Sequence, residues 1–295
     1  MTEFRSGFVS FVGRPNVGKS TLTNALVGSK IAITSSKPQT TRRAIRAIVN
    51  RPGGQLILVD TPGVHRPRTL LGERLNDLVN STLSDVDVIA FCSPANEPIG
   101  PGDKHIVADL EKFPKAKRIA VITKSETVSK EKLAHHLMAV SSLGDWQEII
   151  PVSAKTLDQV DLLADLLVSH LPTSQPLYPE DIETEETLES RICELVRESA
   201  LEEVSEELPH SLAVTLDEIV YPEGEKPQVH VSLWVERDSQ KGIMIGHKGS
   251  RLRDIGSKAR KEIQDLMGRP VYLAIQVRVA QDWQRNPKQL GKLGF

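Results

Sequence analysis

The chain contains little cysteine and no long apolar run. Its two cysteines, Cys92 and Cys193, lie far apart and have no cysteine or histidine neighbours at the spacing of metal ligands. Neither a disulfide framework nor a zinc site is therefore expected, and a reducing cytoplasm is the natural setting. No apolar stretch approaches the roughly 20 residues that span a bilayer, and the first residues lack the apolar segment of a signal peptide. Peripheral contact with a membrane surface stays open.

Aromatic residues are also scarce, at 4%, and the net charge is only −2. A hydrophobic content of 39% is ordinary for a globular protein, and 295 residues suffice for two domains with separate cores. The small net charge hides a local asymmetry: residues 181–207 carry eleven acidic and two basic side chains, whereas residues 240–270 carry eight basic and three acidic ones. The basic stretch favours a polyanionic partner, although a solvated helix face explains the charge alone equally well.

The first 172 residues alternate predicted strands with helices, such as the one at 130–143. Only residues 51–54 separate the second strand from the third. That pair must be antiparallel, because a parallel pair needs a longer crossover. We therefore predict an α/β domain in which a mostly parallel six-stranded sheet has helices on both faces. Its strands are expected at residues 8–12, 44–50, 55–59, 86–91, 118–122 and 148–152.

Residues 173–183 are predicted to be a linker, because prolines and small polar residues disfavour regular structure there. Beyond it the predicted order is helix, strand, strand, helix, helix, strand. This order indicates a second, smaller α+β domain over residues 184–295. Its elements are expected at residues 187–204, 212–220, 228–236, 240–245, 250–267 and 271–279.

Residues 13–20 read G-R-P-N-V-G-K-S and fit the phosphate-binding loop pattern, between a predicted strand and a predicted helix. In such a loop, backbone N–H groups and a helix N-terminus surround the phosphates. Lys19 would reach the outer phosphates, and Ser20 would offer its hydroxyl to Mg²⁺. The residues expected around the phosphates are Gly13, Arg14, Pro15, Asn16, Val17, Gly18, Lys19, Ser20 and Thr21.

A second motif, D-T-P-G at residues 60–63, follows the predicted strand 55–59. Asp60 can hold a metal-bound water, and the Gly63 N–H can approach a γ-phosphate. Thr41, in the segment after the first helix, can complete the Mg²⁺ shell only when a γ-phosphate is present, which is the basis of a switch. The sequence thus predicts a Mg²⁺ site of Ser20, Thr41 and Asp60, a catalytic set of Lys19, Thr41 and Gly63, and nucleotide contacts at Thr61, Pro62 and Val64.

Two further motifs follow later strands. Thr123-Lys124-Ser125-Glu126 stands where a guanine-reading N-K-x-D motif is expected, and Ser153-Ala154-Lys155 fits the S-A-K loop that supports the base. Together with the first two motifs, in this order, they resemble the TRAFAC-class GTPases. That resemblance implies GTP or GDP as the ligand. Glu126 is one methylene longer than the usual aspartate, and Thr123 replaces an amide by a hydroxyl, so we predict looser binding than at a consensus site.

Two residues bear on turnover. Val64 stands where Ras-like GTPases carry a water-orienting glutamine, so slow intrinsic hydrolysis is expected. Asn16 matches a loop asparagine that coordinates K⁺ in some related GTPases. The other interpretation of Asn16 is that it only stabilises the loop, and the sequence leaves both open.

In the second domain, I-G-H-K-G at residues 245–249 joins two predicted helices. Two glycines three apart let a backbone approach a phosphodiester chain. In KH domains this GxxG loop clamps about four nucleotides of single-stranded RNA. The order of elements and the basic balance predict a type II KH domain. Its expected RNA-binding residues are Lys241, Ile245, Gly246, His247, Lys248, Gly249, Arg251, Arg253 and Lys258.

A GTPase domain followed by a type II KH domain resembles the Era family of bacterial GTPases over nearly the whole chain. The resemblance is carried by G-R-P-N-V-G-K-S, P-Q-T-T-R at residues 38–42, D-T-P-G and I-G-H-K-G. It implies a factor that binds the 3′ end of 16S rRNA and assists small-subunit (30S) assembly. It also implies that GTP state controls RNA affinity, and that the protein associates peripherally with the membrane. We expect a monomer, although no feature of the sequence sets the oligomeric state. Two alternatives stay open: an RNA-binding module with a degenerate GTPase domain, and a membrane-surface GTPase without an RNA role.

Overall fold

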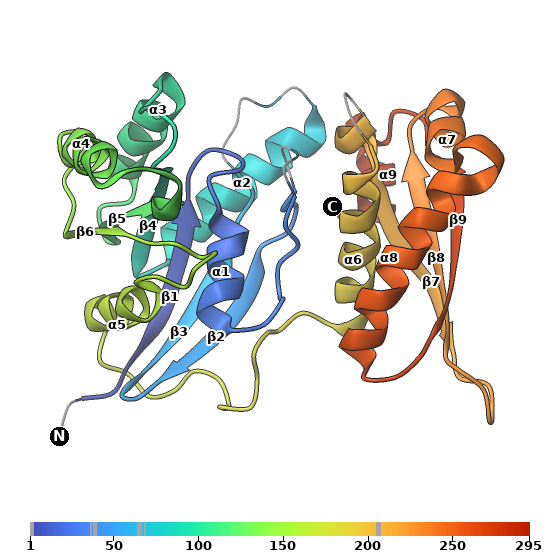
Figure 1. Cartoon of the computed structure of the whole chain (residues 1–295), viewed down its shortest axis with the longest axis horizontal. Coiled ribbons are helices and arrows are strands. Elements are labelled where there is room, and N and C mark those ends of the chain that lie inside the picture. The colour runs from blue at the N-terminus through green and yellow to red at the C-terminus, as the bar shows by residue number, and fades with distance from the viewer. Residues whose placement is uncertain (1–2, 36, 38–39, 64–66, 68, 205–207) are drawn as a thin grey trace. The chain divides into compact units, whose positions relative to one another are not determined.

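The computed structural model describes residues 3–35, 37, 40–63, 67, 69–204 and 208–295. No helix within these ranges is long and apolar enough to cross a bilayer. The chain divides into two compact units (Figure 1). Unit 1 comprises Met1–Thr34, Thr41–Arg66 and Leu75–Glu185, and unit 2 comprises Ser35–Thr40, Pro67–Arg74 and Glu186–Phe295.

Unit 1 is built on a six-stranded sheet in the order β2-β3-β1-β4-β5-β6. All neighbouring pairs are parallel except β2 and β3, which are antiparallel. The predicted sheet is therefore confirmed, including its one antiparallel pair. Its strands are β1 (Arg5–Val12), β2 (Ile45–Arg51), β3 (Gly54–Asp60), β4 (Val88–Pro94), β5 (Lys117–Thr123) and β6 (Glu148–Pro151).

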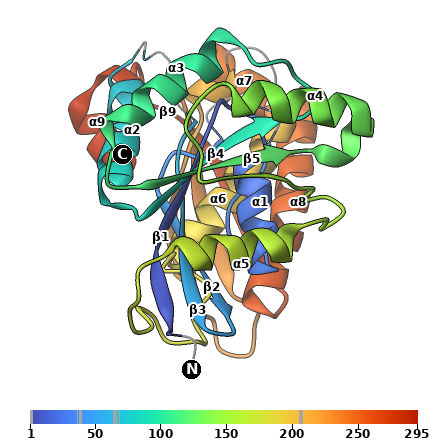
Figure 2. The same ribbon diagram turned by 90° about the vertical axis from the view of Figure 1, so that its left-hand side faces the viewer.

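Helices cover both faces of this sheet, and Figure 2 shows α5 on one side of the strands and α3 and α4 on the other. Strand residues consequently alternate between two cores. In β4, Ala90 and Cys92 pack into the core that contains α1 and α5 residues, whereas Ile89 and Phe91 pack with α2 and α3 residues. The helices are α1 (Lys19–Val27), α2 (Leu70–Asp85), α3 (Pro101–Asp109), α4 (Lys130–Ser141) and α5 (Val160–His170).

The predicted linker is irregular, as expected, but it is docked on unit 1. The side chain of Gln55, fully buried in β3, accepts hydrogen bonds from the backbone N–H groups of Leu177 (2.8 Å) and Tyr178 (2.9 Å) and donates to the Tyr178 carbonyl (2.8 Å). Farther along, the Ile48 N–H donates to the Glu183 carbonyl at 2.8 Å. The segment therefore lies along the β2–β3 hairpin, and the compact unit that contains this hairpin runs to Glu185.

Unit 2 contains a three-stranded sheet in the order β7-β8-β9, in which β7 and β8 are antiparallel and β8 and β9 parallel. Helices α6 and α8 contact each other, and α6 contacts β7 while α8 contacts β9 (Figure 1). The predicted order of helices and strands is confirmed. The elements are α6 (Leu188–Glu202), β7 (Ala213–Val220), β8 (Gln228–Val235), α7 (Asp238–Ile245), α8 (Ser250–Met267), β9 (Tyr272–Val279) and α9 (Pro287–Lys292).

Helix α9 and the turn before it did not emerge from the sequence. Asn286 caps α9 through hydrogen bonds from Lys288 and Gln289, with Pro287 in its first turn. Trp283 is fully buried and donates its indole N–H to the Ser211 carbonyl at 3.0 Å. The end of the chain is thus part of the unit 2 core. A six-residue helix is too short to produce a clear apolar period, which explains the omission.

His136 of α4 should make the stability of unit 1 depend on pH. It is buried, with its Nε2 2.9 Å from the Ser93 hydroxyl, and burial lowers its pKa although Asp103 opposes the shift. The unfolded chain takes up this proton near pH ~6.5 and the folded chain does so only at lower pH. The free energy of unfolding should therefore fall below that pH, by at most about 1.4 kcal/mol per pH unit.

Urea unfolding of wild type and His136→Gln at pH 7.5 and pH 5.5 checks this expectation. Glutamine keeps a hydrogen-bonding group beside Ser93 but does not titrate. We expect the wild type to lose more stability than the variant on acidification. Equal losses in both proteins would contradict the role given to His136.

Candidate functional site

The phosphate-binding loop lies between β1 and α1, and its backbone requires glycine at two positions. Gly18 begins α1 with a φ of 103°, in the left-handed region. A Cβ at Gly13 would come within 2.6 Å of the Cys92 carbonyl oxygen. Because Gly18 has no side chain to cap α1, the first N–H groups of the helix can bind an anion.

Lys19 is held at the centre of this loop and is only 6% exposed. Its Nζ donates to the carbonyl oxygens of Gly13 and Arg14, both at 3.1 Å. Burial lowers the pKa of Lys19, while the Asp60 carboxylate opposes the shift. A bound polyphosphate would favour the charged ammonium further, because an opposite charge stabilises it.

The three residues predicted for Mg²⁺ come together. Ser20 Oγ donates to Asp60 Oδ2 at 2.7 Å, Thr41 Oγ1 lies 3.3 Å from the same oxygen, and the two hydroxyls are 3.1 Å apart. Asp60 is fully buried, and burial raises its pKa against the opposing effects of Ser20, Lys19 and Thr41. Its Oδ1 has no hydrogen-bond partner among the described residues.

These oxygens fit a magnesium ion. A buried carboxylate oxygen without a partner is costly unless a cation or a bound water satisfies it. Mg²⁺ prefers oxygen ligands, keeps several waters and shares its shell with substrate phosphates. Ser20 and Thr41 would offer the two hydroxyl ligands, and Asp60, which accepts from Ser20, would hold a metal-bound water.

The D-T-P-G segment lies directly against the phosphate-binding loop. A Cβ at Gly63 would be 3.1 Å from the Pro15 nitrogen, a tight contact that favours glycine at this position. Thr61 is fully buried, and its hydroxyl donates to the Phe11 carbonyl at 3.3 Å. Pro62 links Thr61 to Gly63 in the chain. Val64 lies outside the described residues, and its role in turnover stays a prediction.

The base-reading segment is anchored to the phosphate-binding loop by two hydrogen bonds. Thr123 Oγ1 donates to the Val17 carbonyl at 2.5 Å, and Lys124 Nζ donates to the Asn16 carbonyl at 2.8 Å. Thr123, whose hydroxyl stands in place of an amide, thus keeps one hydrogen bond to the loop. Lys124 has a φ of 55°, which turns the chain sharply after β5. The base-reading segment is therefore still anchored to the phosphate-binding loop, although a threonine stands where the usual motif has asparagine.

The two segments that are predicted to contact the guanine base lie together. The Ser125 N–H donates to the Val152 carbonyl at 3.2 Å, and Ser153 Oγ accepts from the Thr156 N–H at 3.1 Å. Ala154 and Lys155 follow Ser153 in the same loop. Glu126 is exposed in the short 3₁₀ turn Ser125–Thr127, so its carboxylate is open to a ligand.

One anchor of the loop was missed at the sequence level. Arg14 Nε pairs with Asp103 Oδ1 at 2.9 Å and its Nη1 with Glu97 at 3.1 Å, and the hydrogen bond to Asp103 raises the Arg14 pKa. Asp103 is fully buried and also accepts from the Gly100 N–H at the start of α3. The Arg14 side chain therefore binds α3, and only its backbone carbonyl serves Lys19. No local pattern links residues so far apart in sequence.

Shortening Glu126 to aspartate should tighten GTP binding about fivefold without changing ATP binding. The shorter carboxylate restores the length that suits two hydrogen bonds to guanine N1–H and its 2-amino group, and charge-assisted bonds are worth about 1.5–3 kcal/mol each. Titration with fluorescent GTP and ATP analogues measures both affinities. Glu131→Asp, at an exposed position in α4, is the matched control. Weaker GTP binding by Glu126→Asp would contradict this assignment.

The GxxG loop of unit 2 connects α7 to α8 in a conformation that its glycines permit. Gly246 and Gly249 have φ values of 72° and 78°, and Lys248 has a φ of 49°. A Cβ at Gly246 would come within 2.8 Å of the Arg251 Cβ. The side chains of His247 and Lys248 are exposed, so the loop presents a close backbone and a cation to an approaching chain.

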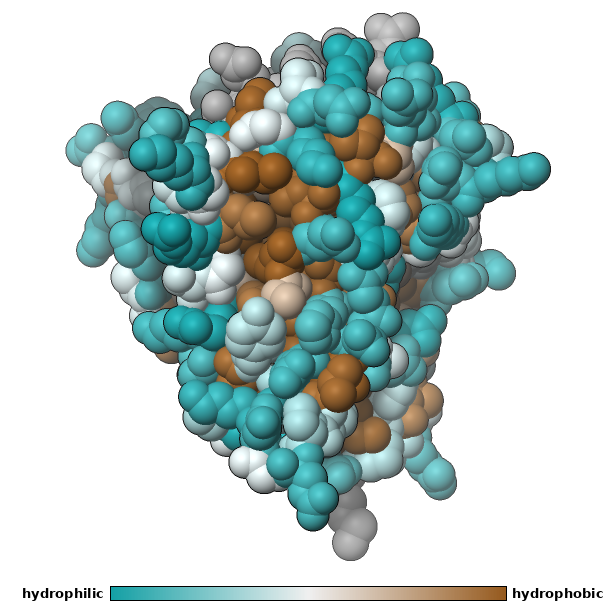
Figure 3. Space-filling model, turned by 90° about the vertical axis from the view of Figure 1, so that its right-hand side faces the viewer, coloured by the Kyte–Doolittle hydropathy of each residue, from teal (hydrophilic) through white to brown (hydrophobic). Residues whose placement is uncertain are grey.

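An open groove of about 320 Å³ begins at this loop and lies between α8 and β9. Arg253 and Arg260 supply its cations. Figure 3, which views the right-hand side of Figure 1, shows an apolar area surrounded by hydrophilic residues. Leu252, Leu273 and Ile275 are half-exposed residues of this groove. The groove is lined by Gly249, Leu252, Arg253, Gly256, Ser257, Arg260, Leu273 and Ile275.

The other predicted RNA residues separate into two groups. Lys241 and Ile245 lie in α7 before the loop, half-buried, and Arg251 Nη1 donates to the Ile243 carbonyl at 2.5 Å, which ties α8 to α7. Lys258 instead pairs with Glu203 and, at 3.5 Å, with Glu202 of α6. Lys258 therefore lies on the side of α8 that faces the acidic helix α6, and it is not among the groove residues.

Two sequence profiles match the chain. The profile of a family described as a 50S ribosome-binding GTPase matches residues 8–124, and that of the KH domain matches residues 207–284. A protein named GTPase Era from a Nocardioides species is 58% identical over 301 residues, which cover 99% of this chain and 96% of the relative. GTPase Era from Mycolicibacterium smegmatis is 58% identical over 299 residues and covers 100% of both chains.

Solved structures match over the same extent. The structure of Era in complex with MgGDPNP and nucleotides 1506–1542 of 16S ribosomal RNA has a TM-score of 0.95 at 35% identity and covers 99% of each chain. A variant of Era from Aquifex aeolicus bound to GDP and AlF₄⁻ has a TM-score of 0.94, also at 35% identity and 99% coverage.

Proposed function

Because this chain belongs to the Era family of GTPases, we propose that it is a GTP-driven switch that binds the 3′ end of 16S rRNA and assists small-subunit assembly. That it hydrolyses GTP follows from the family and from the matching GTPase profile. The RNA part rests mainly on the GxxG loop and the basic-rimmed groove, which occupy one side of unit 2. The Era structure that contains 16S rRNA supports this target.

We assign a GTPase domain to residues 1–172 and a KH domain to residues 184–295. The linker, residues 173–183, is docked against the β2–β3 hairpin of the GTPase domain. In the GTPase domain, Mg²⁺ and a guanine nucleotide fit the site. Ser20 and Thr41 would hold the ion, which neutralises phosphate charge when bound. Lys19 stabilises the outer phosphates, and Gly63 brings backbone close to the same loop.

K⁺ binding at Asn16, slow intrinsic turnover, a monomeric state and peripheral membrane association stay predictions. The Asn16 carbonyl accepts from Lys124, which supports a loop-stabilising role for this residue.

Within unit 2, one hydrogen bond supports control of the RNA domain by nucleotide state. Arg197 of α6, 2% exposed, donates to the Thr40 carbonyl and pairs with Glu194 at 2.5 Å. Thr40 directly precedes Thr41, whose hydroxyl belongs to the Mg²⁺ cluster. A shift of Thr41 on loss of the γ-phosphate would therefore pull the Thr40 carbonyl from a buried guanidinium. Such a loss is costly, because a buried charge needs its hydrogen bonds.

Replacing Arg197 by methionine should reduce the difference in RNA affinity between the GTP-analogue and GDP forms to less than threefold. Methionine keeps much of the side-chain volume but removes the donors to Thr40. Fluorescence anisotropy with each nucleotide measures the ratio. Arg197→Lys, which keeps one charged donor, should be intermediate. A wild-type ratio in a folded Arg197→Met protein would show that this contact does not couple the two events.

The rRNA target is tested by comparing a labelled RNA of the 16S 3′ end with a scrambled RNA of equal length and composition. We expect at least tenfold tighter binding of the natural sequence by the protein loaded with a GTP analogue. Equal affinities would contradict the rRNA target while leaving general RNA binding by the groove intact.

A further inference from the structure

One buried carboxylate joins the first turn of α3 to the phosphate-binding loop. Asp103 is fully buried, and each of its oxygens has a partner. Oδ1 accepts from Arg14 Nε at 2.9 Å, and Oδ2 accepts from the Gly100 N–H at 2.9 Å. The same side chain therefore helps to cap α3 and binds a residue of the loop.

The side chain of Arg14 is confined along its length. A Cβ at Gly102 would come within 3.0 Å of Arg14 Cδ, so the aliphatic stem packs directly on the backbone of α3. Nη1 lies 3.1 Å from a carboxylate oxygen of Glu97. Because a guanidinium is a rigid planar fork, partners on two of its nitrogens fix both its position and its orientation. The helix itself is held in place, since Ile106 and Val107 pack into the core.

The backbone of Arg14 holds Lys19. The carbonyl oxygens of Gly13 and Arg14 both accept from Lys19 Nζ at 3.1 Å. Two residues farther on, Asn16 has a φ of 64°, in the left-handed region. A non-glycine residue keeps such a conformation only when the surrounding structure holds the chain there. The loop thus depends on anchors outside itself, and Arg14 carries one of them.

Separate anchors hold the two halves of the loop. In the second half, the carbonyl oxygens of Asn16 and Val17 accept from the base-reading segment. In the first half, Asp103 acts through Arg14 and therefore lies one residue's backbone away from the oxygens that bind Lys19. Loss of Asp103 should release the first half and leave the base-reading segment in place.

We propose that Asp103 is a positioning residue for GTP hydrolysis, which acts through Arg14 to fix the carbonyl oxygens that direct Lys19. This inference rests on the assignment of Lys19 to the outer phosphates. The attraction between an ammonium and a phosphate changes gradually with distance, whereas the chemical step needs its groups aligned much more closely. Asp103 should therefore matter more for turnover than for nucleotide affinity.

The test compares the full-length wild type with Asp103→Asn, Arg14→Gln and the double variant. Asparagine keeps the shape of aspartate and an acceptor for the Gly100 N–H, but it removes the charge that binds Arg14. Phosphate release under saturating GTP and Mg²⁺ gives kcat, and titration with a fluorescent GDP analogue gives the affinity. Each single variant should lower kcat about tenfold and weaken GDP binding less than threefold. The double variant should be no slower than Asp103→Asn, because both changes break the same connection.

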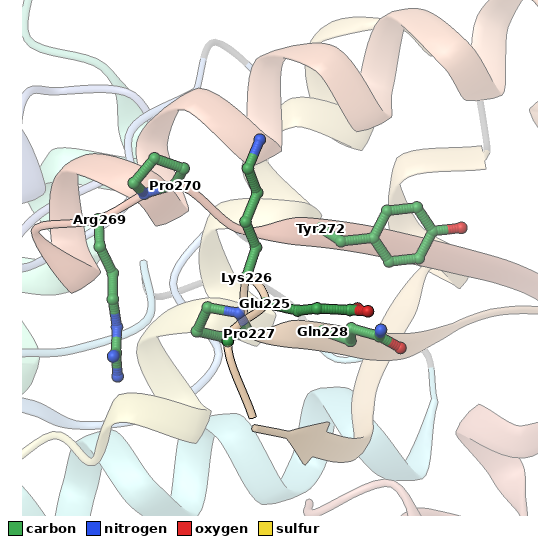
Figure 4. A pocket seen from close by; sticks show the side chains of 8 residues that line it. Glu225, Lys226, Pro227, Gln228, Arg269, Pro270 and Tyr272 are labelled. Carbon is green, nitrogen blue, oxygen red and sulfur yellow. The ribbon is translucent and has the colours of Figure 1, made fainter. Parts of the chain in front are cut away.

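Three control variants separate this role from general effects, and all should keep the wild-type kcat. Arg51→Gln also frees an arginine from two carboxylates, those of Asp161 and Asp165, at the start of the hairpin turn. Arg269→Gln removes an arginine of unit 2 that lines a hollow at the end of α8 (Figure 4). Ser129→Ala removes the cap of α4, so it should lower stability only.

Turnover within twofold of wild type in a folded Asp103→Asn protein would overturn the inference. Losses that multiply in the double variant would overturn it too, since the two residues would then act separately. Equal losses in kcat and GDP affinity would do the same, because they describe a general loosening of the fold. If Asp103→Asn does not fold, Arg14→Gln, at a partly exposed side chain, decides the matter by the same kcat criterion.

Failure of the assigned site gives a different pattern. A wild type without GTP turnover, or a Lys19→Ala protein with wild-type turnover, would contradict the site itself and this inference with it. Loss of turnover in Lys19→Ala together with wild-type turnover in Asp103→Asn and Arg14→Gln would overturn only the role given to Asp103.

Discussion

Replacing Lys19 by alanine is expected to lower GTP turnover about a thousandfold, because it removes the cation that faces the outer phosphates in a buried site. Lys19 is 6% exposed, and its ammonium is held by two carbonyl oxygens of the loop. Phosphate release under saturating GTP and Mg²⁺ measures the effect. The same assay on the wild type also tests the alternative of a degenerate GTPase domain, which predicts that the wild-type protein itself shows no GTP turnover.

A matched control is available on the same sheet. Lys117 begins β5 and lies at the opposite end of that strand from Thr123, with its ammonium bonded to the His170 carbonyl at 2.7 Å. Lys117→Ala removes an equal charge far from the nucleotide loops and should retain wild-type turnover. A Lys19→Ala protein that keeps turnover within threefold of wild type would contradict the assigned site.

Reversing the charge of Lys248 should weaken RNA binding about a hundredfold. The Lys248→Asp change replaces an exposed cation of the GxxG loop by an anion, at the point where the loop backbone is proposed to meet the phosphodiester chain. Anisotropy with single-stranded RNA at two salt concentrations measures both the loss and the reduced salt dependence.

Lys258→Asp provides the comparison, because it makes the same charge change on the same helix pair. Lys258 is bound to Glu202 and Glu203 and faces α6 rather than the groove. Its reversal should change RNA affinity less than threefold. Similar losses in the two variants would show that RNA binding depends on the net charge of unit 2 and not on the loop.

Local patterns predicted the elements that carry both sites. Each nucleotide motif follows a buried strand, and the carboxyl ends of parallel strands meet at one edge of a sheet. The order of motifs along the chain was therefore enough to predict that Ser20 and Asp60 lie together. Alternation in residues 228–236 and the glycines of the loop predicted the KH domain in the same way. These inferences needed no knowledge of distant contacts.

Pairings between distant residues were not predictable. Arg14 with Asp103, and Gln55 with the backbone at Tyr178, depend on how elements pack after the chain has folded. Lys258 shows the same limit on one helix: its charge was visible in the sequence, but the side of α8 covered by the acidic α6 was not. Thr123 was judged by its chemistry alone, and the structure shows that its hydroxyl still reaches the loop.

We propose that nucleotide state at the phosphate-binding loop controls RNA binding by the KH domain. The most direct test is the dissociation constant of one labelled RNA of the 16S 3′ end, measured on the same protein loaded with a GTP analogue and with GDP, both with Mg²⁺. We predict at least tenfold tighter binding in the GTP-analogue form. Equal dissociation constants in the two states would contradict the claim, even if GTP turnover and RNA binding were each present.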